Sequence, residues 1–313
     1  MNKKVLLIVG PTAVGKTEVS LQLAKLLDSE IVSADSRQVY KYMDIGTAKP
    51  TEDQRAQVRH HFIDIKYPDE YYSAGQYGRE ARDCIEEIFS RGKQPIVVGG
   101  SGLYIRALVD GFFVPKVSDV NVKSDLKKRA AEKGISVMYE RLKSVDPVTA
   151  NRLHATDTQR ILRALEVFEI TGQPFSSFLE NKPKPANFHQ VFFGLTLERG
   201  KLYSKIESRV DQMFTDGFLD EVKGLRSRGY GSSLNALQTV GYKEALLFLE
   251  GTIDSSEMLD LIKQKSRNYA KRQMTWFRKD QRINWVDAQT FKSTLELASY
   301  IHNEFNRLEK INS

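Results

Sequence analysis

The chain has 313 residues, of which 41% are hydrophobic and 28% charged, with a formal net charge of +7 at pH 7. This composition is ordinary for a globular protein, and the length fits one large domain or a domain carrying a second one. The single cysteine, Cys84, excludes an internal disulfide and a zinc site of several thiolates, which suits a reducing cytoplasm. Because the N-terminus runs directly into a predicted strand, we expect neither a signal peptide nor a membrane span.

The segment from Gly10 to Thr17, GPTAVGKT, matches the phosphate-loop pattern G-x-x-x-x-G-K-[ST]. It follows an apolar run at residues 5–9 and precedes a helical pattern, which is the context that such a loop requires. Its glycines allow backbone N–H groups to face phosphate oxygens, and the helix N-terminus favours the anion. Lys16 would add a positive charge and Thr17 a hydroxyl for Mg²⁺. A glycine turn without a ligand is the alternative, and the loop alone predicts only a bound di- or triphosphate.

Two further predicted strands, 30–34 and 95–98, end in residues that could reach the same ligand. Ligands of open parallel sheets lie at the carboxyl ends of the strands. Asp35 follows the first strand and could be catalytic, could cap a following helix, or could hold a water ligand of Mg²⁺. Ser101 lies in the cluster GGSG after the second strand and could offer a hydroxyl, or the cluster could be an ordinary tight turn.

Other elements are predicted from periodicity and from glycine or proline breaks. Strands are expected at 62–65 and 191–195, helices at 74–91 and 203–216, and a loop at 39–50. The second helix presents Arg209 four residues after Lys205. The adjacent His60 and His61 point to opposite faces, which disfavours a metal pair.

Residues 115–185 break the alternation of strands and helices. Helices are predicted at 123–133, 137–144 and 158–170. The basic sequence KPKP at 182–185 is expected to be a stiff segment through which the chain leaves the insertion. We therefore expect an α/β core with a parallel sheet, formed by 1–114 and 191–313, and a helical insertion domain at 115–190.

Positive charge is concentrated in the later parts of the chain. Residues 1–113 contain 15 Lys or Arg and 15 Asp or Glu, so the whole surplus follows them. Residues 263–282 contain eight basic residues and one acid, Asp280, and we expect a helix with an apolar seam of Ile262, Tyr269 and Trp276. A basic surface of this kind suggests a polyanion larger than a nucleotide, although a solvated helix face is the alternative.

Taken together, the motifs resemble one enzyme family. They are GPTAVGKT, SADSRQVY, MDIGTAKP, VGGSGLY, DTQRILRALEVF, SRVDQMF, TVGYKE and AKRQMTWFR. The chain is similar to the tRNA dimethylallyltransferases (tRNA isopentenyltransferases) of bacterial type, from residue 5 to about residue 285. The resemblance implies a P-loop NTPase-like core with a helical insertion and a channel through the protein. It also implies transfer of a dimethylallyl group from its diphosphate to N6 of the adenosine 3′-adjacent to the anticodon in tRNA.

The resemblance also implies roles for individual residues. Asp35 would be the general base, Arg209 and Ser101 would lie at the leaving diphosphate, and Thr17 would bind the cofactor Mg²⁺. The diphosphate-binding residues would be Gly10, Thr12, Ala13, Val14, Gly15, Lys16, Thr17 and Arg209. The tRNA-contacting residues would be Asp35, Ser36, Arg37, Gln38, Gln159, Arg160, Ile161, Leu162, Arg163, Gln238, Thr239, Val240, Gly241, Tyr242 and Lys243, to which the basic helix adds Arg267, Lys271 and Arg272.

The expected partners are the tRNA anticodon loop and dimethylallyl diphosphate, and we expect a monomer. Three other functions remain open from the sequence. A small-molecule kinase or NTPase would use the same loop for ATP. An adenylate isopentenyltransferase would act on free AMP, ADP or ATP, and only the basic surface argues against it. A nonenzymatic RNA-binding module would keep the loop as a nucleotide switch.

Overall fold

The computed structural model describes residues 3–111, 117, 119–179 and 184–310. They form two compact units, which are described separately: unit 1 is Met1–Val109 with Pro185–Ser313, and unit 2 is Asp110–Lys184. None of the helices within these described ranges combines the length and the hydropathy needed to cross a membrane.

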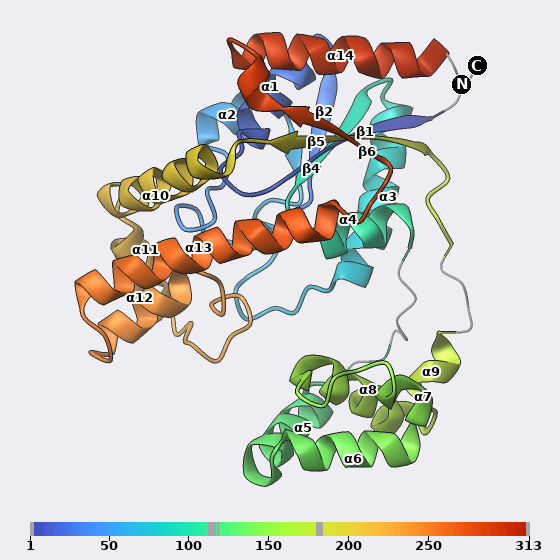
Figure 1. The fold of residues 1–313 in the computed structure, drawn as a ribbon, viewed down its shortest axis with the longest axis vertical. Helices are drawn as coiled ribbons and strands as arrows, with labels where there is room; N and C mark the ends of the chain where they lie inside the picture. The colour runs from blue at the N-terminus through green and yellow to red at the C-terminus, as the bar shows by residue number, and fades with distance from the viewer. Residues whose placement is uncertain (1–2, 112–116, 118, 180–183, 311–313) are drawn as a thin grey trace. The chain divides into compact units, whose positions relative to one another are not determined.

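Unit 1 is built on one parallel sheet of six strands in the order β3-β2-β4-β1-β5-β6 (Figure 1). The strands are β1 (Lys4–Val9), β2 (Ser29–Ser33), β3 (His60–His61), β4 (Gln94–Gly99), β5 (His189–Thr196) and β6 (Ile283–Asp287). β1 lies inside the sheet, where Leu7 is paired with Val97 of β4 and with Phe192 of β5. This topology confirms the predicted α/β fold with a phosphate-loop core.

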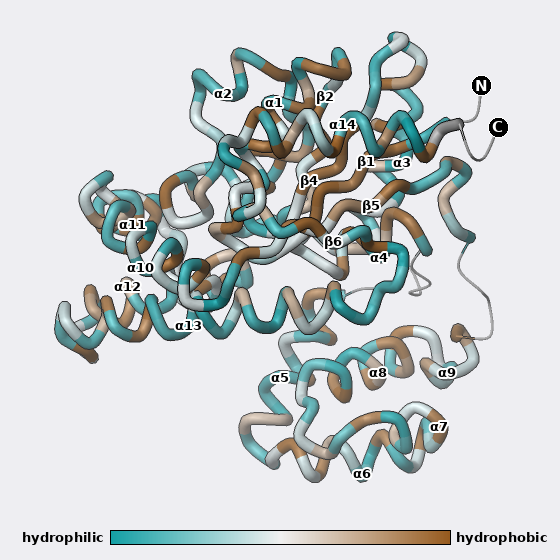
Figure 2. The backbone as a smooth tube through the Cα atoms, turned by 45° about the horizontal axis from the view of Figure 1, so that its top comes forward, coloured by the Kyte–Doolittle hydropathy of each residue, from teal (hydrophilic) through white to brown (hydrophobic). Residues whose placement is uncertain are grey.

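The central strands are apolar throughout because both faces of the sheet are covered. Val5, Leu7 and Val9 of β1 contribute to the core on one face, and Leu6 and Ile8 contribute to the core on the other. Figure 2 shows these strands as a hydrophobic layer in the middle of unit 1. The sheet therefore holds the carboxyl ends of its strands in fixed positions.

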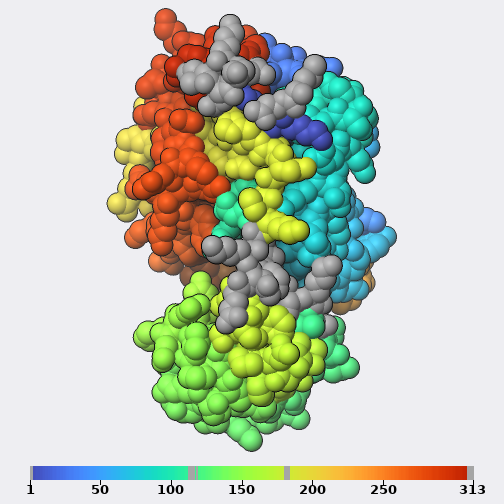
Figure 3. Space-filling view, turned by 90° about the vertical axis from the view of Figure 1, so that its right-hand side faces the viewer, coloured from blue at the N-terminus to red at the C-terminus, as the bar shows by residue number. Residues whose placement is uncertain are grey.

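Helices cover the two faces of the sheet (Figure 1). α1 (Lys16–Leu26) and α14 (Thr294–Lys310) cover one face, and α3 (Ala74–Ser90) and α4 (Gly102–Val109) cover the other. The remaining helices of unit 1 are α2 (Glu52–Gln57), α10 (Arg199–Thr215), α11 (Phe218–Ser227), α12 (Tyr242–Leu249), α13 (Ser255–Phe277) and the 3₁₀ turn η1 (Ala288–Thr290). In Figure 3, segments from the beginning, the middle and the end of the chain lie side by side on one face of this unit.

In the part of unit 2 that the structure describes, all the regular secondary structure is helical. It consists of α5 (Val120–Lys133), α6 (Ile135–Val145), α7 (Pro147–Ala150), α8 (Thr158–Thr171) and α9 (Phe175–Phe178), so the three helices predicted for this region are present. Its own small core includes Leu126, Leu142 and Leu165. The buried carboxylate of Asp146 joins α7 to α9 by accepting the N–H groups of Thr149 and Ser176 at 3.0 and 2.8 Å. Residues 115, 116, 118 and 180–183 of the expected insertion and its basic exit lie outside the described residues.

The prediction of a strand at 62–65 was wrong. The strand β3 is formed by His60 and His61, and the chain then leaves the extended conformation, because Phe62 and Asp64 have φ values of 64° and 57°. Local apolar character indicated the right region, but it could not show where the backbone turns.

The prediction for the basic C-terminal helix was partly wrong. α13 begins at Ser255 and ends at Phe277, so the basic residues from 278 onward lie outside it. Its buried positions are Met258, Ile262, Ala270, Gln273 and Phe277. Trp276, which was expected in the apolar seam, is exposed, and its ring lies against Gly102, where an added Cβ would come within 2.2 Å of Cδ1. The sequence analysis also missed β6 and α14.

Candidate functional site

A cavity of about 1130 Å³ lies at the carboxyl ends of β1, β2 and β4, entirely within unit 1. It is lined by the phosphate loop, Asp35, segments of 44–55, the Gly99-Gly100 turn, one side of α10, and Tyr269 and Gln273 of α13. A cavity of this size can hold a small ligand together with part of a larger one. The predicted site residues Lys16, Thr17, Asp35 and Arg209 meet here.

The phosphate loop has the backbone that its glycines predict. Gly10 and Gly15 have φ values of 142° and 102°, and Ala13 between them is also left-handed at 62°. A Cβ at Gly10 would lie 2.7 Å from the carbonyl oxygen of Leu195, so only glycine fits there. Val14 is buried in the core, which anchors the loop, and Thr17 lines the cavity in the first turn of α1. The loop thus presents a helix N-terminus to the cavity, which favours an anion.

Lys16 extends along the loop and donates from Nζ to the carbonyl oxygens of Gly10 and Pro11 at 3.0 and 2.7 Å. Burial lowers the pKa of Lys16 to about 8, although the charge of Asp35 acts in the opposite direction. The neighbouring charge of Arg209 lowers the pKa of Lys16 further. An anionic ligand would relieve this unfavourable environment, because it stabilises the charged form of the lysine.

α10 directs basic side chains into the same cavity. Lys201, Lys205 and Arg209 are spaced four residues apart and all line it. Nη1 of Arg209 donates to Oγ1 of Thr12 at 3.0 Å, which fixes the guanidinium at the phosphate loop. Burial lowers the pKa of Arg209 from its usual value, against the opposing charges of Asp35 and Glu18.

Asp35 begins a tight turn at the end of β2. Its Oδ1 accepts the backbone N–H of Arg37 at 2.8 Å and that of Gln38 at 3.4 Å. The following residues form a turn and no helix, which rules out the alternative of a helix N-cap. One carboxylate oxygen therefore organises the turn, while the side chain as a whole lines the cavity.

Ser101 was expected at the leaving diphosphate, and in this structure its side chain contacts Ser36. Its side chain is buried, and its Oγ accepts the backbone N–H of Ser36 at 3.0 Å and lies 3.3 Å from Oγ of Ser36. In this structure the hydroxyl holds the turn that follows Asp35. Its assignment to the leaving diphosphate stays a prediction.

Gln273 is a site residue that the sequence analysis missed. Its Oε1 accepts the backbone N–H of Thr12 at 2.8 Å, and its Nε2 donates to the carbonyl oxygen of Gly100 at 3.0 Å. The amide group of α13 therefore connects the phosphate loop to the glycine turn after β4. A Cβ at Gly100 would lie 2.1 Å from that Nε2. The only sequence signal was a glutamine within the basic segment AKRQMTWFR.

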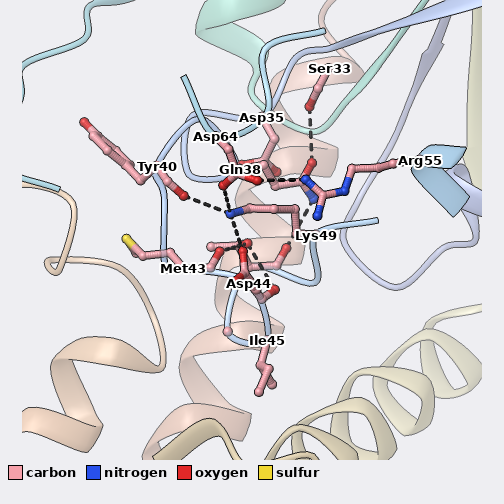
Figure 4. Close-up of polar contacts among 12 residues, drawn as sticks. Ser33, Asp35, Gln38, Tyr40, Met43, Asp44, Ile45, Lys49, Arg55 and Asp64 are labelled. Atoms are coloured by element: carbon pink, nitrogen blue, oxygen red, sulfur yellow. Dashed lines mark hydrogen bonds and ion pairs between the residues drawn. The ribbon is translucent and has the colours of Figure 1, made fainter. Parts of the chain in front are cut away.

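A polar network holds the loop 39–50 in place (Figure 4). The buried Lys49 donates from Nζ to the carbonyl oxygen of Tyr40 at 2.9 Å and forms ion pairs with Asp44 and Asp64. Arg55 reaches the other oxygen of Asp64 at 2.8 Å. A buried charge is tolerated only when it is paired in this way.

The amide of Gln38 is fully engaged by the same loop (Figure 4). Its Nε2 donates to the carbonyl oxygens of Thr47 and Ala48 at 3.3 and 3.1 Å, and its Oε1 accepts the hydroxyl of Ser33 at 3.2 Å. On the opposite side, Glu221 accepts the N–H groups of residues 44–46 and the hydroxyl of Tyr242. The loop MDIGTAKP is thus fixed on two sides by charged residues from elsewhere in the chain.

The remaining residues expected to contact tRNA are in diverse environments. Exposed side chains are Gln159, Arg160, Gln238, Lys243, Lys271 and Arg272. Half-buried side chains are Ser36, Arg37, Leu162, Arg163, Thr239, Val240 and Arg267. Ile161, Gly241 and Tyr242 are buried, so the side chains of Ile161 and Tyr242 pack in the protein rather than facing RNA. Gln159–Arg163 belong to unit 2, and the others to unit 1.

Comparison with known proteins gives a consistent result. The sequence model of the family described as IPP transferase matches residues 38–280. A protein named tRNA dimethylallyltransferase in Carboxydothermus hydrogenoformans is 47% identical over 290 residues, which are 92% of this chain and 93% of that protein.

Solved structures agree with the sequence comparison. The tRNA isopentenylpyrophosphate transferase of Bacillus halodurans is 38% identical, with a TM-score of 0.71 and 99% of both chains covered. A eukaryotic dimethylallyltransferase acting on tRNA is 30% identical, with a TM-score of 0.77, and 91% of this chain and 74% of that one are covered.

Proposed function

The chain belongs to the IPP transferase family, and from this we propose that it transfers a dimethylallyl group from dimethylallyl diphosphate to N6 of the adenosine 3′-adjacent to the anticodon in tRNA. The observation that carries the proposal is the single cavity that joins a phosphate loop, two half-buried cations and a carboxylate. The products are N6-isopentenyladenosine and diphosphate.

The phosphate loop, Lys16 and Arg209 bind the diphosphate group. As the allylic C–O bond breaks, negative charge accumulates on this leaving group, and the two cations stabilise it in a site that is partly removed from water. Lys201 and Lys205 of α10 line the same cavity and add positive potential.

The donor set of the cavity fits Mg²⁺. The hydroxyl of Thr17, which lines the cavity in the first turn of α1, would be the protein's oxygen ligand, and phosphate oxygens of the substrate would complete the coordination. When bound, Mg²⁺ would neutralise charge on the diphosphate. Among the described residues, no group of three or more His, Cys, Asp or Glu is arranged to hold a metal.

Asp35 acts as the general base. The amine of adenine is a poor nucleophile because its lone pair is delocalised into the ring, so removal of an N6 proton as the C–N bond forms lowers the barrier. Oδ1 of Asp35 accepts the hydrogen bonds that form the turn. The carboxylate of Asp35 also lines the cavity that contains the diphosphate site. The target base must leave its stack, which costs least in an RNA loop.

One assay separates this proposal from its alternatives. Purified protein with Mg²⁺ and radiolabelled dimethylallyl diphosphate is offered unmodified tRNA, AMP or ATP as the acceptor. We expect label in tRNA and little in the free nucleotides, because the exposed Lys271 and Arg272 provide a surface for a polyanion. Efficient labelling of AMP without a preference for tRNA would instead establish an adenylate isopentenyltransferase, and phosphate release from ATP would establish a kinase or NTPase.

A further inference from the structure

Two exposed aromatic rings lie on the surface of unit 1 beside the loop 39–50. Tyr42 and Tyr67 have 39% and 41% of their surface exposed, and their ring centroids are 6.0 Å apart. Together with Lys41 and Arg228, they are called here the tyrosine patch. Large aromatic side chains are usually buried, and neighbouring exposed rings suggest a binding surface.

Each ring of the tyrosine patch has a cation against it. Nζ of Lys41 lies 4.1 Å from the ring centroid of Tyr67, and the guanidinium carbon of Arg228 lies 4.7 Å from that of Tyr42. Arg228 is also held by the carbonyl oxygen of Gly224 at 2.9 Å. The patch therefore combines flat apolar surfaces with positive charges that are fixed next to them.

The backbone of Tyr42 has a strained conformation. Its φ of +66° is left-handed, a conformation that is unfavourable for a bulky side chain and free of strain for glycine. The exposed ring gains little from core packing that could offset this strain. Strained residues of this kind concentrate at functional sites.

Two residues of the tyrosine patch, Lys41 and Tyr42, lie in the short segment between Gln38 and Asp44, both of which line the cavity of the proposed active site. Asp44, two residues after Tyr42, lines the catalytic cavity, and the turn of Asp35–Gln38 precedes Lys41 by three residues. The two halves of the patch are joined because the N–H of Lys41 donates to the carbonyl oxygen of Lys66 at 2.8 Å, next to Tyr67. The patch is therefore tied by the backbone to a segment whose two ends line the cavity.

We propose that the tyrosine patch is a stacking site for an unpaired base of the RNA acceptor, with Lys41 and Arg228 contacting the flanking phosphates. The proposal rests on the proposed function, since it requires an RNA acceptor. Stacking on an aromatic ring tolerates any base, because every base has a π-face, and adjacent cations attract the backbone. A patch of this kind would position the RNA and would not select its sequence.

The backbone strain gives a sharp test with Tyr42→Gly. Glycine removes the ring and relieves the strain, so the variant should melt at the same temperature as the wild type or higher, while its Kd for unmodified tRNA rises on the order of 10-fold. Tyr42→Phe keeps the ring and should bind as the wild type does. Tyr300→Ala, at a similarly exposed tyrosine on α14, should leave the Kd unchanged.

A second measurement reports stacking directly. An anticodon stem-loop RNA with 2-aminopurine at successive loop positions should show one position whose fluorescence changes on binding to the wild type and not to Tyr42→Gly. An unchanged Kd in Tyr42→Gly would overturn the inference even if the wild type modifies tRNA. A lower melting temperature together with weaker binding would also overturn it, since the ring would then be structural. A wild type that labels AMP and does not bind tRNA would contradict the proposed function itself.

Discussion

Asp35 combines a structural role with the proposed chemical one, and substitutions can separate the two. Asp35→Asn keeps the Oδ1 acceptor for the N–H groups of Arg37 and Gln38 but removes the basic carboxylate. We expect kcat to fall by about 10²- to 10⁴-fold, with tRNA affinity within a few-fold of the wild type, because only the proton acceptor is lost. Single-turnover prenylation and direct tRNA binding measure the two effects.

Asp35→Ala is the matched comparison at the same residue, because it removes both the charge and the turn acceptor. It should lose kcat similarly and also weaken tRNA binding, because the backbone N–H groups of Arg37 and Gln38 lose their shared acceptor. If Asp35→Asn instead keeps kcat at saturation and loses affinity for Mg²⁺ or diphosphate, the carboxylate is a metal-site residue and its assignment as the base is wrong.

At the scale of the element, α13 acts on the site through Gln273. Gln273→Met has a similar length and suits a helix, but it leaves the partly buried N–H of Thr12 and the buried carbonyl oxygen of Gly100 without their partner. Each unsatisfied buried group costs about 1–3 kcal/mol. We expect a lower free energy of unfolding and a KM for dimethylallyl diphosphate that is raised on the order of 10-fold, because the phosphate loop loses its support.

Chemical denaturation and steady-state kinetics test this role of α13. The control is Gln264→Met, which makes the same change at an exposed position of the same helix and should alter neither quantity. A Gln273→Met protein with unchanged stability and KM would show that the link between α13 and the phosphate loop has no functional role.

The distribution of charge over the whole molecule predicts how the protein binds tRNA. The first 113 residues carry no net charge and the remainder carries +7. If about six phosphates are contacted, tRNA affinity should fall roughly 10³-fold between 50 and 200 mM salt, because counterions are released on binding. A free nucleotide has too few charges to show such a slope.

The structure identifies which basic residues are available for these contacts. Arg267 forms an ion pair with Glu207, whereas Lys271 and Arg272 are exposed. The double variant Lys271→Ala/Arg272→Ala should reduce the salt slope by about 1.5 to 2 without changing which base is modified. The charge-matched control Lys25→Ala/Arg307→Ala, on α1 and α14, should keep the wild-type slope. Equal slopes in the two double variants would rule out α13 as the RNA-binding helix.

Several features of the protein were determined by its sequence alone. The phosphate loop could be predicted because its function depends on consecutive residues, whose glycines and lysine set the local backbone and charge. The alternation of apolar strands and helices gave the α/β core, since both faces of a parallel sheet are buried. Asp35 and Arg209 could be placed at the site because one ends a strand and the other lies on a helix in a family motif.

Only the tertiary structure decided how these parts are held. Gln273 meets Thr12 across 261 positions of sequence, and Glu221 meets the loop 44–46 across more than 170, so no local pattern could indicate either contact. The end of α13 at Phe277 and the strained turn at Tyr42 depend likewise on packing against distant segments. Local periodicity predicts which side of a helix or strand is apolar. The partners of a buried polar group are determined only when distant segments pack together in the tertiary structure.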